Sequence, residues 1–507
     1  MRRFMLRAGL AIVFNGLAVC YLWAAEGKQM VQASEFKNFA EAIAKAKLKT
    51  LVIDQPQSIA SNLTIPSDVH LFFVGEGALR KGAKGRVSVV IQSPITAPQR
   101  QIFVGFEPGE VVLRNSQKAI PQWWGAKAND DKDDSKAIQS AIDSEASVVH
   151  LPQGHYIVNQ PLNITNRPGG GLVFQGDGFS VGSGTCLHAN TGGVLFDTSG
   201  TQYVDFRDFS VEGGKTNPST IAFLFARSAK TEYTKYAQFH SLTNVRVRLP
   251  SIPEANNGNG TVAVYNYAAE LWRAWNVYLM ADQPLVFTGY NIFNVKSAFT
   301  ELWVGYPSMS ECTVDGASTL HALDGSCVIV DNGIAIRLVN TYLTGTAKSK
   351  GRIQYAIHIR GPGFWTRTFT YTGHFEYEGG LVCISVRAVN LNVEATGAPL
   401  KPEQPVILLD NPNSCIWGGK VSYTHINFGQ THTYPLIKAV GKHCGIVGVT
   451  IGLYEGQMID APNGPFQNNI VQAFFSHEPK INVEPKASYL LLAGEKSAVR
   501  SPKTSVK

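Results

Sequence analysis

The chain has 507 residues, of which 44% are hydrophobic and 16% are charged, against roughly 25% charged residues in an ordinary soluble domain. This balance excludes a coiled coil, a disordered chain and a protein with several membrane spans. Seven basic residues near the two ends account for the formal charge of +7: Arg2, Arg3, Arg7, Lys496, Arg500, Lys503 and Lys507. The rest of the chain is close to neutral, so we expect no nucleic-acid partner.

The N-terminus has the pattern of an export signal. A basic start precedes an apolar run over residues 8–25, as in secretory signal peptides. Trp23 makes the cleavage site a poor one, so an uncleaved membrane anchor is the alternative. We therefore expect residues 1–25 to be a signal peptide or a signal anchor, and the protein to be secreted or periplasmic.

Six cysteines remain after that segment: Cys186, Cys312, Cys327, Cys383, Cys415 and Cys444. None of them forms a C-x-x-C pair, so the zinc and thioredoxin-type motifs have no support. Buried thiols and one or two disulfides both remain open. The candidate pairs are Cys415 with Cys444, expected to stack in neighbouring coils, and Cys312 with Cys327.

Most of the chain is predicted to be strands. Helices are expected at residues 35–47 and 135–144, from apolar residues at helical spacing. Short apolar strands recur about every 20 to 45 residues, as in a solenoid with insertions; they start at Val194, Phe223, Val262, Leu285, Val328, Ile357 and Val406. Each is followed by an alternating partner strand, expected at residues 203–211, 239–247, 271–279, 293–302 and 334–343. We predict an all-β, right-handed, single-stranded parallel β-helix; a β-sandwich is the alternative.

One stretch is more specific than these repeats. Residues 124–143 read WGAKANDDKDDSKAIQSAID, residues 148–158 read VVHLPQGHYIV, and residues 172–178 read LVFQGDG. They resemble the opening of the pectate-lyase-like right-handed β-helix superfamily, in its rhamnogalacturonase-, epimerase- and tailspike-like branch. The resemblance implies that the helix at 135–144 caps the solenoid. Ala128 and Asn129 stand where that family usually has Gly and Asp.

The expected division of the chain follows from the motif and the repeats. Residues 26–120 should hold a helix and leading coils, residues 121–460 the main β-helix, and residues 461–507 a last strand and a tail. Because the motif is architectural, it predicts the fold and not the chemistry.

A column of basic residues is the first candidate site. Aligning the partner strands places these residues together: Arg207, His240, Arg273, Lys296, Arg337, Arg367 and Lys420. Equivalent positions stack about 4.8 Å apart in parallel strands, which suits an extended acidic polysaccharide bound through its carboxylates. The ordinary interpretation, solvated basic residues on outer strand faces, has equal weight.

A second column lies five residues after several of these positions and contains Glu212, Tyr278, Glu301, Tyr342 and His425. A base beside cations is what β-elimination of a uronate needs. The predicted catalytic residues are Arg273, Lys296, Glu301, Arg337 and Tyr342. The predicted substrate-binding residues are Arg207, His240, Trp272, Trp303, Arg367, His374 and Glu376.

The run His374 to Glu378 leaves two other chemistries open. Its alternating carboxylates would suit glycoside hydrolysis or a Ca²⁺ site; no metal ligand is assigned and no cofactor is identified. The predicted function is an exported polysaccharide-active enzyme, first of all a lyase, on an acidic polysaccharide. The alternatives are a glycoside hydrolase, a non-catalytic glycan-binding or tailspike-like module, and a cell-surface structural protein.

Overall fold

The computed structural model describes residues 29–360 except 83, 115–117, 166–170, 230–236, 290, 304–308, 332 and 347–354. Beyond residue 360 it describes the backbone of strands only. The predicted signal segment lies outside the described residues. The chain divides into two units, one made of residues 1–127 and 136–150, the other of residues 128–135 and 151–507. No helix in the described part of the chain is both long and apolar enough to span a membrane.

The leading unit consists of short parallel strands stacked as coils. One sheet contains β1 (Met30–Gln32), β2 (Thr50–Ile53), β5 (His70–Phe73) and β8 (Ile95–Thr96). A second contains β4 (Leu63–Ile65), β7 (Val89–Ile91) and β10 (Val111–Leu113), and a third β3 (Pro56–Ile59), β6 (Ala78–Lys81) and β9 (Phe103–Val104). A further parallel pair is β11 (Lys118–Ala119) with β12 (Val148–His150).

Both expected helices are present. The first is α2 (Phe39–Lys45), which starts where Asn38 accepts a hydrogen bond from the Glu41 N–H and buries Phe39, Ala42 and Ile43. The second is α3 (Ser135–Ile142), whose apolar face of Ala137, Ile138, Ala141 and Ile142 is buried as predicted. By its contacts, most of α3 groups with the leading unit. Two single turns, η1 (Ala33–Glu35) and η2 (Pro121–Trp124), complete the helical elements of this unit.

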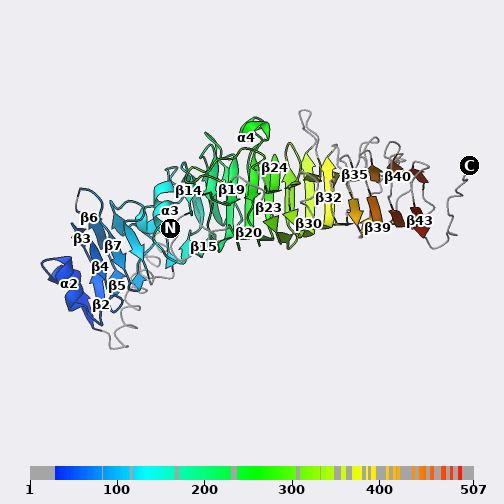
Figure 1. The fold of residues 1–507 in the computed structure, drawn as a ribbon. Helices are drawn as coiled ribbons and strands as arrows, with labels where there is room; N and C mark the ends of the chain where they lie inside the picture. Colours follow the sequence, from blue (N-terminus) through cyan, green and yellow to red (C-terminus); the bar gives the residue numbers. More distant parts are fainter. Residues whose placement is uncertain are drawn as a thin grey trace, which may run out of the picture. The chain divides into compact units, whose positions relative to one another are not determined.

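The main unit is a right-handed parallel β-helix, as predicted. Its strands stand side by side along the coil stack in Figure 1. The first strands of successive coils form one sheet, here called the long sheet, and every expected first strand lies in it. Its members are β14 (Leu162–Asn163), β17 (Val194–Asp197), β19 (Ile221–Ala226), β21 (Val262–Tyr267), β24 (Gln283–Thr288), β28 (Val328–Asp331), β31 (Ile357–Arg360), β33 (Ile384–Ser385), β35 (Ile407–Leu409), β38 (Ile437–Ala439), β40 (Gln457–Ala461) and β42 (Lys480–Val483).

The partner strands form a second sheet, here called the bent sheet. Its members in this unit are β13 (Gly154–Val158), β15 (Leu172–Gln175), β16 (Thr185–Ala189), β18 (Val204–Gly213), β20 (Ser241–Arg248), β22 (Arg273–Trp275), β23 (Tyr278–Ala281), β26 (Thr313–Asp315), β27 (Thr319–Ala322), β30 (Ile336–Thr346), β32 (Thr368–Glu378) and β34 (Asn390–Glu394). Four of the five expected partner strands are found here. The fifth prediction is wrong, because β26 and β27, and not residues 293–302, pair with β22 and β23 in this sheet.

In four coils of this sheet, a single residue with a left-handed backbone conformation marks a bend. Asp208 (φ 61°), Asn244 (φ 52°), Asn276 (φ 51°) and Asn340 (φ 49°) adopt left-handed backbone conformations, which Asp and Asn tolerate better than other non-glycine residues. Asn244 Nδ2 donates to Asp208 Oδ1 at 2.9 Å, and Asn276 Nδ2 to Asn244 Oδ1 at 2.8 Å. Since the core lies inside the corner, the outer surfaces before and after the bend face different directions.

The interior of the coils is filled by stacked aromatic side chains. Phe196 and Phe223 lie 5.2 Å apart with an interplanar angle of 7°, and both also contact Phe206. These side chains are fully buried, because strand alternation turns every second residue inward. The interior is therefore closed in this part of the β-helix, and ligand-binding chemistry belongs on its outer surface.

The outer face of the long sheet carries its own cover. Residues 291–303 lie over it, and Phe293 and Val295 pack in one apolar cluster with Leu224, Tyr265 and Val286 of the sheet. The Tyr265 hydroxyl donates to Asn291 Oδ1 at 3.1 Å, and the Trp303 N–H donates to the Arg227 carbonyl at 2.9 Å. We call residues 291–303 the cover segment. It explains the wrong fifth strand, because its apolar residues face the sheet while it is not a sheet strand itself.

The remaining elements are α4 (Ala255–Gly258), the pair β25 (Met309–Ser310) with β29 (Gly333–Ile334), and a C-terminal sheet of β36 (Cys415–Trp417), β37 (Lys420–Ser422), β39 (Gly445–Gly452), β41 (Ile470–Phe475) and β43 (Tyr489–Ala493). In this last sheet Cys415 is the register partner of Gly445, one residue beyond Cys444. The expected register of the two cysteines is therefore wrong by one residue. Cys312 and Cys327 are both buried and are not joined in a disulfide, so the second candidate pairing is wrong.

Candidate functional site

Part of the predicted basic column exists on the bent sheet, before the bend. Register pairs Ser241 with Arg273, Arg273 with Thr313, and Thr313 with Arg337, so the two arginines share one column, two coils apart. Both are exposed. Arg207 occupies the next outward column, where it aligns with Thr243, and Thr243 aligns with Trp275. We call Arg207, Arg273, Trp275 and Arg337 the arginine face.

Aromatic side chains lie exposed on and beside the arginine face. Trp275 is 55% exposed. Tyr203 and Phe239, just before β18 and β20, stack at 4.8 Å with an interplanar angle of 1°, although both are about half exposed. Large aromatic side chains left in water are a feature of binding surfaces. Flat rings beside guanidinium groups would suit a sugar polymer with carboxylates.

The other predicted basic and acidic residues do not join this face. Lys296 and Glu301 are exposed residues of the cover segment, over the long sheet. Trp303 ends that segment, with the Arg227 guanidinium carbon 4.4 Å from its ring centroid. The misassigned strand at residues 293–302 had placed Lys296 and Glu301 in the columns and Trp303 beside them. The expectation that Lys296 shares a groove with Arg273 and Arg337 is therefore wrong.

Two more residues that were predicted to bind substrate, Trp272 and His240, are buried in the core and cannot contact a ligand on the surface. Trp272 is fully buried and packs against Phe225 and Phe287. His240 is 1% exposed, stacks against Phe225, and its Nδ1 accepts a hydrogen bond from the Val204 N–H at 3.4 Å. Burial lowers the pKa of His240 to about 3, so its imidazole is neutral. Both residues precede an outward-facing position by one, and strand alternation turns them into the core.

Three predicted residues lie where the side chains are not described. Arg367 is outside the described residues. The backbone of β32 aligns His374 with Tyr342 and Glu376 with Thr344. Tyr342 is half-buried and stands in the same column as Tyr278, with Thr319 between them. The roles of these residues stay predictions.

After the bend, the structure brings together a group that the first column missed. It consists of Glu212, Arg246, Arg248 and Tyr278, and we call it the glutamate cluster. Glu212 is the register partner of Arg248, and Arg246 is the register partner of Tyr278. The Arg248 Nη1 to Glu212 Oε2 distance is 3.8 Å, and the Arg246 guanidinium carbon lies 5.4 Å from the Tyr278 ring centroid. Glu212 and Tyr278 were in the second predicted column; alternation in the strand Arg246-Val247-Arg248 was the signal for the two arginines.

The glutamate cluster is partly withdrawn from water. The Glu212 side chain is 19% exposed, and that of Arg248 is 43% exposed. Burial raises the pKa of Glu212, against the opposing effect of the Arg248 and Arg246 charges. Among the described residues, neither Glu212 Oε1 nor Arg246 Nε has a hydrogen-bond partner. A carboxylate with a raised pKa beside two cations and a phenol is suited to proton transfer near neutral pH.

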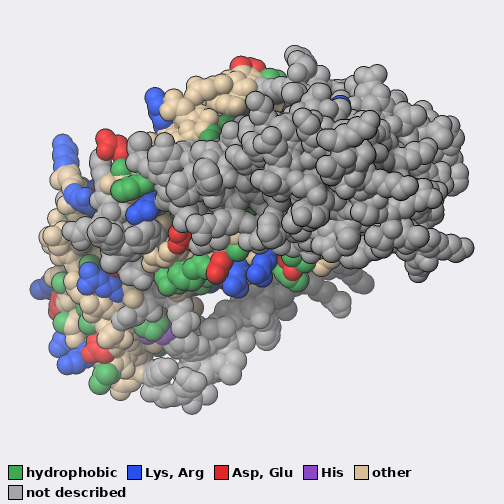
Figure 2. Space-filling model, turned by 45° about the vertical axis from the view of Figure 1, so that its right-hand side comes forward, with side chains coloured by type: hydrophobic (Ala, Val, Ile, Leu, Met, Phe, Trp, Pro, Cys, Tyr) green, Lys and Arg blue, Asp and Glu red, His purple; other side chains and the backbone are tan. Residues whose placement is uncertain are grey.

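Charged side chains of both signs are visible among the described residues on one face of the molecule (Figure 2). In the view of Figure 2, basic and acidic side chains lie interspersed, with exposed hydrophobic side chains among them. This pattern agrees with the nearly neutral body expected from the sequence.

Comparison with known proteins bears on the fold. Residues 123–319 match the family described as rhamnogalacturonase A/epimerase, pectate lyase-like. No curated protein matches the sequence. The matched residues include the motif at 124–178 from which the resemblance was inferred. Residues 123–319 therefore carry the sequence pattern of the pectate-lyase-like superfamily of right-handed parallel β-helices.

Several solved structures are similar over much of the chain at low identity. The A-module of a mannuronan C-5 epimerase from Azotobacter vinelandii is 13% identical, with a TM-score of 0.42 over 68% of this chain and 98% of that one. A surface adhesin of Streptococcus pneumoniae is 10% identical, with a TM-score of 0.39 over 74% and 91%. An α-1,3-glucanase of Streptomyces thermodiastaticus is 13% identical, with a TM-score of 0.42 over 72% and 70%.

Proposed function

We propose that the protein is an exported enzyme that acts on an acidic polysaccharide, and that the glutamate cluster carries its chemistry. The observation that supports this most directly is the half-buried Glu212, whose pKa is raised by burial and which lies opposite Arg248 on the strand that also carries Arg246. The superfamily adds support at a coarser level, because the family that matches residues 123–319 is named for carbohydrate-active enzymes. The arginine face would hold the polymer on the neighbouring surface.

The proposed reaction is β-elimination of a uronate. Arg246 and Arg248 neutralise the sugar carboxylate, which makes the proton on the adjacent carbon, C5, more acidic. Glu212 removes that proton as a general base. The electron pair forms the C4–C5 double bond as the C4–O bond to the neighbouring sugar breaks. The Tyr278 hydroxyl protonates the leaving oxygen, so that the reaction consumes no water.

The test is the ultraviolet absorbance of the conjugated double bond that elimination creates. Purified protein is incubated with a panel of polyuronates. Glu212→Gln should lower the rate by about a hundredfold or more, the usual range for losing a general base. Glu301→Gln is the matched control, since it makes the same change on the cover segment and should leave the rate unchanged. A rate that falls with Glu301→Gln and survives Glu212→Gln would show that the cluster is not the site.

A second candidate function is non-catalytic binding of the same polymer. It is favoured by the exposed aromatic rings beside Arg273 and Arg337, which form an open surface. In that case the protein is retained on an immobilised polyuronate and no absorbance develops. Arg273→Glu should abolish retention, whereas Lys296→Glu on the cover segment should not. Equal effects of the two substitutions would indicate charge attraction without a specific surface.

A further inference from the structure

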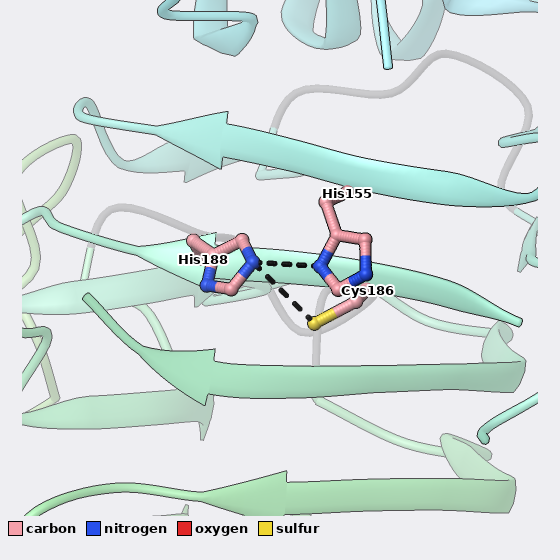
Figure 3. A group of neighbouring side chains, drawn as sticks. All are labelled: His155, Cys186 and His188. Atoms are coloured by element: carbon pink, nitrogen blue, oxygen red, sulfur yellow. Dashed lines mark hydrogen bonds between the residues drawn. The ribbon is translucent and has the colours of Figure 1, made fainter. Parts of the chain in front are cut away.

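A compact group of side chains that can bind a metal lies on the outer surface of the bent sheet, in its first coils. His155 comes from β13, and Cys186 and His188 come from the neighbouring strand β16. One ligand atom from each residue lies within 4.8 Å of the other two. Figure 3 shows the two imidazoles edge to edge, with the Cys186 sulfur beside them. The proposed lyase chemistry uses none of these residues, and only His155 lies in the stretches that carry the resemblance to the superfamily.

The sheet itself places the three side chains together. His155 is the register partner of Cys186, and His188 follows two residues later on the same strand. Strand alternation turns all three to one face, and parallel pairing sets neighbouring positions about 4.8 Å apart. Ligands held on adjacent sheet strands are fixed more firmly than ligands on loops.

The loop before α3 adds a further support on one side. Asn129 Oδ1 accepts a hydrogen bond from the His155 N–H at 3.1 Å, and the Asn129 N–H donates to the His155 carbonyl at 2.8 Å. The negative charge of Asp131 acts on His188, opposing the burial that lowers the pKa of this imidazole. Asn129 is one of the residues at which the sequence departs from the family motif, so the departure coincides with the backbone support of His155.

The separations between the ligand atoms of the three residues are close to those around a tetrahedrally coordinated ion. His155 Nδ1 and His188 Nε2 lie 2.9 Å apart, and Cys186 Sγ lies 4.0 Å from His188 Nε2. Bond lengths of about 2.0 Å to nitrogen and about 2.3 Å to sulfur give separations of about 3.3 and about 3.6 Å in a tetrahedral site. The nitrogens must therefore part, and the sulfur approach, by about 0.4 Å each. The hydrogen bond between the two imidazoles would give way to the ion.

We propose that His155, Cys186 and His188 bind a divalent transition-metal ion of the zinc type, with the fourth position left to water or substrate. Imidazole and thiolate ligands select zinc, cobalt or copper over Ca²⁺ and Mg²⁺, which prefer oxygen. Three protein ligands and one open position are the arrangement of zinc sites that act on a bound molecule. Glu212, the register partner of His188, is the nearest carboxylate along the column.

Binding has a definite proton balance. A cysteine thiol ordinarily carries its proton at neutral pH in a metal-free protein. The ion binds the thiolate, and one proton leaves for solvent for each ion bound. Metal affinity should therefore fall as the pH is lowered. His155 and His188 must be neutral and carry their remaining protons on Nε2 and Nδ1, respectively.

Cobalt is the probe, because Co²⁺ bound to thiolate has a charge-transfer band in the near ultraviolet. The full-length protein is treated with chelator, desalted and titrated with Co²⁺. We expect the band to saturate at one ion per chain and to disappear when Zn²⁺ is added. Cys186→Ser should abolish it, and His188→Ala should weaken cobalt binding by tenfold or more.

Cys312→Ser is the matched control, since Cys312 is also a buried cysteine outside any disulfide, next to strand β26 of the bent sheet. It should leave the band intact. The melting temperature of each metal-free variant shows whether it folds, and His155→Ala supplies an independent ligand deletion. The proposal is overturned if the wild type shows no band, or if the band survives Cys186→Ser. Because the readout is metal binding, the result is independent of any lyase activity.

Discussion

The outer faces of the two sheets of the main unit differ although the same coils build both. On the long sheet, outward positions are apolar, and the cover segment buries them in a cluster with Phe293 and Val295. On the bent sheet, outward positions carry arginines, Glu212 and Trp275, and several are exposed. The outer face of the long sheet therefore forms a second hydrophobic core, together with the cover segment of the same chain. The outer face of the bent sheet retains the polar chemistry that a ligand can reach.

The sharpest way to break this comparison is to place a charge on each face. Leu224 is fully buried beneath the cover segment. Leu224→Asp should lower the free energy of unfolding by about 3 kcal/mol or more, because an unpaired carboxylate is buried there. Thr243→Asp on the bent sheet should lower it by less than about 1 kcal/mol. Urea midpoints of both variants, followed by tryptophan fluorescence, compare the two; equal losses would mean that the bent sheet is also covered.

A second test uses one buried carboxyl from the covered face. Asp197 accepts hydrogen bonds from the Ser199 and Ser297 hydroxyls, and the latter belongs to the cover segment. Burial raises the pKa of Asp197. Below the unfolded pKa its contribution to stability is fully present, and it is lost as the pH rises through the higher folded pKa.

Asp197→Asn removes this titration. The variant should therefore gain stability relative to the wild type as the pH rises above about 4, the unfolded value of Asp. Urea midpoints at pH 4 and pH 7 measure the change. Glu212→Gln is the companion on the open face: its pKa shift has the same direction, but its side chain is less buried, so its change should be smaller. A larger pH effect at Glu212 than at Asp197 would reverse the comparison.

The bend provides the third test, because it sets the direction of the two halves of the bent sheet. Asn244 has a φ of 52° and links the side chains of Asp208 and Asn276. Asn244→Ala should lower the free energy of unfolding by about 1–2 kcal/mol, the cost of a left-handed residue with a Cβ. Asn244→Gly loses the same hydrogen bonds without that strain. Thermal melting should therefore rank Ala below Gly; equal melting temperatures would assign the whole effect to the lost side-chain hydrogen bonds.

The coil pattern was predictable because it depends on alternation and on repeated apolar strands. The long sheet was recognised in every expected coil, and the motif at residues 124–178 located the beginning of the main unit. Residues 293–302 could not be placed correctly, because an apolar segment that packs on a sheet has the same residue pattern as a strand within it. That single error moved Lys296 and Glu301 into columns that they do not occupy, and it placed Trp303 beside them.

The site was predictable only in part, and for the same reason. Arg273 and Arg337 share a column as expected, whereas His240 and Trp272 are one residue out of phase and therefore point into the core. The His155, Cys186 and His188 group had a usable signal: Cys-x-His in a strand puts both side chains on one face, and His155 precedes Cys186 by one coil. The C-x-x-C pattern does not include this group, since that spacing belongs to loops and not to stacked strands.

The smallest expected effect on stability concerns Arg207, on the open face. It forms an ion pair with Asp205, and the Arg207 side chain is 40% exposed. Ion pairs in contact with water contribute little to folding, because the charges are well solvated when apart. Arg207→Gln should therefore change the free energy of unfolding by less than about 1 kcal/mol.

If the arginine face binds an acidic polymer, the same substitution should weaken retention on an immobilised polyuronate at low salt and reduce the dependence of retention on salt. Arg114→Gln is the control, since Arg114 pairs with Glu145 at 3.8 Å in the leading unit and is 58% exposed; it should change neither quantity. A stability loss of several kcal/mol for Arg207→Gln would make this residue structural, and the open face would then resemble the covered one.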